Sequence, residues 1–143
     1  MSFPVALPPR VALGPRTWLL ARACGLIASR IATRPERMDR AVRRAQRSAR
    51  PSSPAQAERA VLAVCTATIR LGGTAACLTR SLAALLYCRA HGHTPALIFG
   101  IRPGTAQVHA WLEADGHPVA EPSNPCLLYT PVTRYPSQEI NQP

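Results

Sequence analysis

A cysteine near the start of a predicted helix and a histidine on a predicted strand have the side chains that a covalent catalyst needs. Cys77 follows the turn Gly72-Gly73-Thr74 and heads an apolar segment, and His109 lies 32 residues later in the sequence Val-His-Ala-Trp-Leu-Glu. A thiol near a helix N-terminus has a lowered pKa, and a neighbouring imidazole can accept its proton. The pair therefore predicts Cys77 as a nucleophile with His109 as its general base.

The third catalytic residue depends on the register of a predicted hairpin. If residues 114–116 (Ala-Asp-Gly) form a three-residue loop, His109 pairs with Glu121 and both side chains share a face of the sheet. A two-residue Asp-Gly loop would turn Glu121 to the opposite face. A carboxylate fixes the tautomer of an imidazole, so the chemistry favours the first register and Glu121. Glu113, on the face of His109, and Asp115, in the turn, are the weaker alternatives.

The remaining thiols and imidazoles have simpler explanations. A zinc site built from Cys88, His91 and His93 lacks a fourth ligand and matches no strong spacing motif, so we expect no metal and no cofactor. The simplest alternative for Cys77 is a small buried hydrophobic residue, and for His109 a hydrogen-bonded histidine on a half-buried strand. The other cysteines are expected to be core or surface thiols: Cys24, Cys65, Cys88 and Cys126.

Helices come first in the predicted element order and a small sheet follows, which is typical of an α+β domain. Apolar periodicity predicts helices over 16–33, 35–49, 55–71 and 75–90, with Thr74 as the N-cap of the last and Cys77 at its third position. Strands are expected over 96–101, 107–113 and 117–121. The predicted organisation is an irregular arm (1–15), a basic helical lead-in (16–50), a core (51–122) and a C-terminal tail (123–143).

Positive charge is concentrated in the N-terminal third. All 17 basic residues other than histidine are arginine, the formal net charge is +10, and eight arginines lie between Arg30 and Arg50. This charge favours an acidic peptide, an acidic protein or a membrane surface. Nucleic acid is not favoured, because no aromatic residues interleave the arginines. An odd number of cysteines predicts a reducing cytoplasm, and no apolar stretch is long enough to span a membrane.

Three segments together resemble a known family. They are Cys77-Leu-Thr-Arg-Ser-Leu-Ala83, Gly92-His-Thr-Pro-Ala-Leu-Ile-Phe-Gly100, and His109-Ala-Trp-Leu-Glu113 with Asp115-Gly116. In order and spacing they resemble the leader peptidase of lasso peptide biosynthesis, the stand-alone transglutaminase-like cysteine peptidase that is one half of the split B protein. The resemblance covers about residues 55 to 122.

The resemblance implies a fold, a reaction and partners. The fold would be papain-like, with the catalytic cysteine at the start of a central helix packed on a small antiparallel sheet. Cys77 would be the nucleophile and His109 the base; the third residue of the family is usually aspartate, whereas here Glu121 fits the position. The implied partners are a ribosomally made precursor peptide, a separate leader-binding recognition protein and an ATP-dependent lasso cyclase.

Two other functions remain open at the level of sequence. The same dyad could transfer the acyl group to an amine instead of water, as a transglutaminase does. Alternatively, the chain could be a non-catalytic module whose basic helices hold an acidic peptide, a membrane or RNA. In the peptidase reading, a thioester would form on Cys77, and its backbone N–H, with a second donor that the sequence does not identify, would stabilise the oxyanion.

Overall fold

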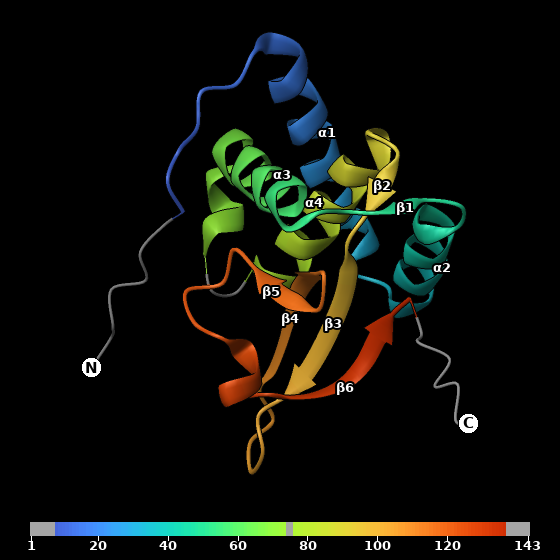
Figure 1. The fold of residues 1–143 in the computed structure, drawn as a ribbon, viewed down its shortest axis with the longest axis vertical. Coiled ribbons are helices and arrows are strands. Elements are labelled where there is room, and N and C mark those ends of the chain that lie inside the picture. Colours follow the sequence, from blue (N-terminus) through green and yellow to red (C-terminus); the bar gives the residue numbers. More distant parts are fainter. Residues whose placement is uncertain (1–7, 74–75, 137–143) are drawn as a thin grey trace.

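Four helices precede the sheet, as the sequence predicts (Figure 1). The structure, a computed structural model, describes residues 8–73 and 76–136. The helices are α1 (Pro15–Ile31), α2 (Pro35–Gln46), α3 (Pro54–Ala67) and α4 (Cys77–Ala90), with a short 3-10 helix η1 (Ile69–Gly72) between the last two. Proline occupies the first position of α1, α2 and α3, where its missing N–H costs no hydrogen bond.

The main sheet has four antiparallel strands in the order β5-β4-β3-β6. Its strands are β3 (Ala96–Ile101), β4 (Val108–Ala114), β5 (His117–Val119) and β6 (Thr130–Tyr135). A second, two-stranded sheet joins β1 (Arg50–Pro51) in parallel to β2 (His93–Thr94). Between β5 and β6 lies a 3-10 helix, η3 (Pro125–Leu127). This helical layer on a small antiparallel sheet confirms the predicted α+β class.

The core lies between α4 and one face of the sheet. Leu82 and Leu85 of α4 belong to the same buried cluster as Leu97 and Leu112, which pair directly across β3 and β4. The helices α1 and α3 pack against the other sides of α4. The central helix is therefore buried on most sides, as its apolar sequence predicts.

The hairpin between β4 and β5 does not have the expected register. Ala114 pairs with His117, which leaves a two-residue loop of Asp115 and Gly116. Both loop residues have positive φ, 51° and 76°, as a type I′ turn requires, and Asp-Gly is a preferred sequence for that turn. The predicted three-residue loop, and the strand pairing of His109 with Glu121 that depends on it, are therefore wrong, because the turn chemistry of Asp-Gly decides the register.

Two further elements differ from the sequence prediction. The strand β5 ends at Val119 and not at Glu121. The strand β6 lies in the stretch that we expected to be irregular, where it pairs with β3 through a β-bulge between Phe99 and Gly100. The sequence Thr-Pro-Val-Thr-Arg-Tyr hides this strand, since its mostly exposed side chains give no apolar period.

Candidate active site

Cys77 is the first residue of α4, two positions closer to the helix start than predicted. The first N–H groups of a helix have no partner within it and carry the positive end of the helix dipole, so this position favours a thiolate. Thr74, the expected N-cap, lies outside the described residues. Arg80, one turn further along α4, donates from Nη1 to the carbonyl oxygens of Leu71 and Gly73, each at 3.2 Å. Arg80 thus ties the chain before Cys77 to the helix that Cys77 begins.

The start of α4 docks against an open edge of β4. Because β5 pairs only with residues 112–114, the backbone of Ala110 is free on that side of the strand. The Ser81 hydroxyl donates to the Ala110 carbonyl at 3.4 Å, and the Ala110 N–H donates to the sulfur of Cys77. A short β5 is therefore what brings the thiol beside the strand that carries His109.

His109 and Glu121 are in contact, as the sequence predicts, although the hairpin register differs from the predicted one. His109 Nε2 donates to Glu121 Oε2 at 3.0 Å, and the two side chains are 18% and 11% exposed. In the observed register a straight β5 would have turned Glu121 away. Instead, Ala120 has a φ of 54°, which breaks the strand and returns the carboxylate to His109.

Cys77 also interacts with the imidazole of His109. Nε2 faces Glu121, which leaves Nδ1 as the ring nitrogen available for the hydrogen bond with the thiol. Burial raises the pKa of Cys77, but the hydrogen bonds from His109 and from the Ala110 N–H, together with the charges of His109 and Arg80, outweigh it. The net result is a pKa below the ordinary value.

The same contacts act in the opposite direction on His109. Hydrogen bonds to Cys77 and Glu121, and the negative charges of both, overcome the effect of burial and raise the pKa of His109 to about 9. The pKa of the thiol is lowered while that of the imidazole is raised, which favours transfer of the thiol proton to His109. After that transfer the cysteine is a nucleophile and the histidine is an acid.

Two aromatic rings lie against the imidazole. The ring centroid of Trp111 is 5.8 Å from that of His109 and stacked at 20°, and that of Tyr129 is 5.1 Å away. Gly100, directly opposite His109 on β3, makes room for them: a Cβ at this position would come within 2.8 Å of Trp111 and 2.9 Å of Tyr129. The rings restrict the imidazole and attract its positive charge.

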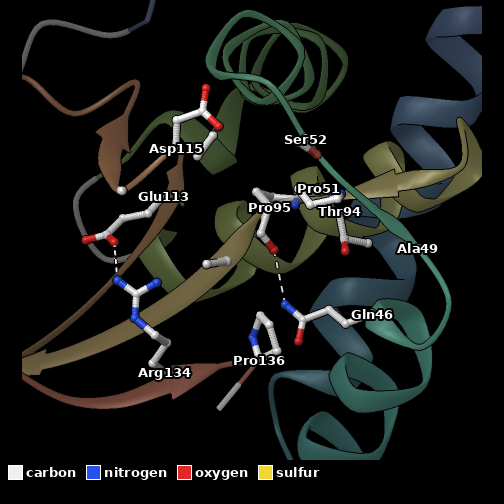
Figure 2. Close-up of a pocket in the computed structure, with 13 residues that line it drawn as sticks. Gln46, Ala49, Pro51, Ser52, Thr94, Pro95, Glu113, Asp115, Arg134 and Pro136 are labelled. Atoms are coloured by element: carbon white, nitrogen blue, oxygen red, sulfur yellow. Dashed lines mark hydrogen bonds and ion pairs between the residues drawn. The ribbon is translucent and has the colours of Figure 1, made fainter. Parts of the chain in front are cut away.

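Glu113 and Asp115, the alternative carboxylates, have other partners. Glu113 is buried, accepts a hydrogen bond from Trp111 Nε1 at 3.1 Å and pairs with Arg134 of β6. Asp115 lies in the turn and helps to line a cavity of about 230 Å³ that contains none of Cys77, His109 and Glu121 (Figure 2). Figure 2 shows Glu113 pointing to Arg134 at the same cavity. Neither carboxylate is placed to orient His109.

The other cysteines differ from Cys77 in their surroundings. Burial raises the pKa of Cys24 and of Cys65, and it raises that of Cys88 to about 11, while Cys126 is exposed. Within residues 8–73 and 76–136 no three His, Cys, Asp or Glu side chains are grouped to hold a metal ion. In contrast to the three buried cysteines, Cys77 has a lowered pKa.

The comparison with protein families gives one match. The profile of the Transglutaminase-like superfamily matches residues 18–134, which is most of the chain. The chain belongs to the transglutaminase-like superfamily. No curated protein and no solved structure matched it. Membership agrees with the α+β fold and indicates chemistry of the cysteine peptidase or acyltransferase type.

The superfamily match also extends beyond the segment that the sequence motifs cover. It includes the basic helices α1 and α2 and the strand β6, so these elements lie within the matched domain. The domain boundaries proposed from the sequence stay predictions. No helix in the described part of the chain is long and apolar enough to cross a bilayer.

Sequence reasoning missed five contributors to the site. The Ala110 N–H and the Ala120 backbone act through conformation and leave no side-chain signal. Gly100 lies opposite His109 across β3 and β4, and Tyr129 comes just before β6, a strand that the sequence does not predict. Arg80 is different, since its position three residues after Cys77 places it in the same turn of the helix.

Proposed function

We propose that this transglutaminase-like protein is a cysteine peptidase that removes the leader from a ribosomally made lasso peptide precursor. The observation that supports the proposal is the position of His109, which hydrogen-bonds to Glu121 at 3.0 Å and whose pKa is raised by its interactions with Cys77 and Glu121. Superfamily membership supports the chemistry. The order and spacing of the motifs around Cys77 and His109 support the substrate class.

The proposed mechanism uses the charges that the fold maintains. The Cys77 thiolate attacks the scissile carbonyl carbon, and the backbone N–H of Cys77, the first residue of α4, stabilises the oxyanion. His109 then gives its proton to the leaving amine, and a thioester remains on Cys77. Water, deprotonated by His109, hydrolyses the thioester and releases a free carboxylate. Glu121 keeps the imidazole oriented and stabilises its charged form throughout.

The resemblance also supports a set of partners. The precursor would be delivered by a separate leader-binding recognition protein, and the released core peptide would pass to an ATP-dependent cyclase that closes the ring. All of these steps would take place in the cytoplasm. The Cys77–His109–Glu121 group needs no metal or cofactor for the reaction, since nucleophile, acid and oxyanion donor all come from the chain.

The experiment is cleavage of a lasso precursor peptide in the presence of its recognition protein, followed by mass spectrometry. Cys77→Ala and His109→Ala should each abolish cleavage, whereas Cys126→Ala, which removes an exposed thiol, should cleave like the wild type. Cleavage by Cys77→Ala at the wild-type rate would contradict the proposal.

The superfamily also contains acyltransferases, and the same spectra separate the two reactions. Hydrolysis leaves a free C-terminal carboxylate on the leader. Transfer to an added amine leaves an amide of higher mass. We expect the carboxylate as the main product even with a small amine present, and a predominant amide would assign the protein to the transferase class instead.

A further inference from the structure

The helix α1 buries its small residues and exposes its large apolar ones, which is the reverse of most amphipathic helices. It turns its small residues inward, and Ala21, Cys24 and Ala28 are at most 5% exposed. Gly25 lets the helix approach closely, since a Cβ there would lie 3.3 Å from Thr68 Oγ1. The large side chains face outward: Leu19 is 62% exposed, Leu26 60%, Ile27 51% and Trp18 42%. Period and composition alone would have placed these large residues in the core.

The exposed side chains form one face. Leu19, Ala23 and Leu26 follow each other at intervals of four and three residues, which places them in one row along the helix. Single exposed apolar residues are common, but a contiguous row usually marks an interface. We call the exposed residues Trp18, Leu19, Ala23, Leu26 and Ile27 the outer face of α1.

Only positive charge accompanies the outer face. Exposed Arg16, Arg22 and Arg30 lie along the helix, and the first acidic residue of the chain is Glu36. Directly after α1, a hollow of about 460 Å³ is lined by three more arginines, Arg34, Arg37 and Arg40, with Glu36 as its one acidic member. Arginines therefore lie both along the helix that carries the apolar row and in the hollow that follows it.

We propose that α1 is a docking helix for an anionic membrane surface. An interfacial helix has Trp, Leu or Phe on one side and Arg or Lys beside them, and anionic lipid supplies both the apolar interior and the negative headgroups that these residues need. A second copy of the chain is a poor fit, since its own α1 would present arginines to arginines. Figure 1 shows α1 at the end of the molecule opposite the β3–β4 turn, so this surface is separate from that end of the sheet.

The test is co-sedimentation of the full chain with vesicles. We expect binding to vesicles of equal parts phosphatidylcholine and phosphatidylglycerol, weak binding to phosphatidylcholine alone, and release by salt. Leu19→Ser with Leu26→Ser should lower the partition coefficient at least about tenfold, and Arg30→Glu should do the same. Because these side chains are exposed, the circular dichroism spectrum should not change.

Matched controls lie at the far end of the molecule. Val108 is 58% exposed and Arg102 is an exposed arginine of the β3–β4 turn, so Val108→Ser and Arg102→Glu should bind vesicles like the wild type. Tryptophan fluorescence gives an independent readout. Trp111 is fully buried, so a blue shift on anionic vesicles should come from Trp18 and disappear in Trp18→Phe.

Two results would overturn the proposal. Equal binding by the wild type and the Leu19/Leu26 double variant would show that the outer face takes no part. Absence of binding to both kinds of vesicle would exclude a membrane and leave the groove of a partner protein as the occupant of this face. Neither result bears on cleavage by Cys77, so this proposal and the peptidase proposal fail independently.

Discussion

At the scale of single residues, the site is a cysteine and a histidine whose contacts shift their pKa values in opposite directions. The sulfur of Cys77 accepts a hydrogen bond from the backbone N–H of Ala110 and interacts with His109. His109 in turn donates a hydrogen bond to the carboxylate of Glu121. The pKa of His109 is raised from 6.5 to about 9 in the folded chain. Its stabilising contribution is therefore complete below pH 6.5 and is lost as the pH rises through about 9.

The residue-scale prediction concerns Glu121. Glu121→Gln keeps an oxygen for His109 Nε2 but removes the negative charge that helps to raise the pKa of His109. The basic limb of the kcat/KM profile, near pH 9 in the wild type, should move down by about 1 pH unit. Glu113→Gln, which changes a carboxylate without contact to His109, should leave this limb in place. A basic limb unchanged in Glu121→Gln would contradict the assigned role of Glu121.

Glu121 also illustrates what sequence reasoning can and cannot reach. The pairing of this carboxylate with His109 was expected, but on a hairpin register that the structure contradicts. Chemistry favours this carboxylate because a cysteine–histidine pair needs a third, acidic group. The contact between Glu121 and His109 depends on the positive φ of Ala120, and no sequence pattern predicts that conformation for alanine.

At the scale of elements, the short strand β5 has two effects on the site. It leaves the edge of β4 open for α4, and its break at Ala120 returns Glu121 to His109. Alanine in the left-handed region costs roughly 1–2 kcal/mol, which the surrounding contacts must offset. The backbone of Ala120 is therefore a positioning feature for the carboxylate.

Two variants of Ala120 test this interpretation. Ala120→Gly adopts a φ of 54° without strain and should keep the wild-type pH profile. Ala120→Val resists this conformation, so Glu121 should move from His109 and the basic limb should shift down as in Glu121→Gln. The comparison uses pH profiles of both variants together with their circular dichroism spectra. A folded Ala120→Val enzyme with a wild-type basic limb would show that Glu121 does not depend on this turn.

At the scale of the whole molecule, the sequence predicts the layers better than the surfaces. The helix-then-sheet order, the central apolar helix and strand 96–101 follow from period and composition. The inverted packing of α1 could not be predicted, since which face is buried depends on small residues fitting closely against α3 and α4. The strand β6 was missed for a related reason: its pairing with β3, and not its own side chains, makes it a strand.

The central claim is that the folded chain maintains a Cys77 thiolate beside a His109 imidazolium, and alkylation of Cys77 by iodoacetamide across pH tests it most directly. Labelling is followed at Cys77 by peptide mass spectrometry, with exposed Cys126 as the internal reference.

The wild type should react rapidly well below pH 9, because the pKa of Cys77 is lowered, and its rate should change again near pH 9 as His109 loses its proton. In His109→Ala this rapid alkylation of Cys77 below pH 9 should disappear. A single inflection at the ordinary pKa of a thiol, the same in the wild type and in His109→Ala, would contradict the ion pair and with it the proposed mechanism.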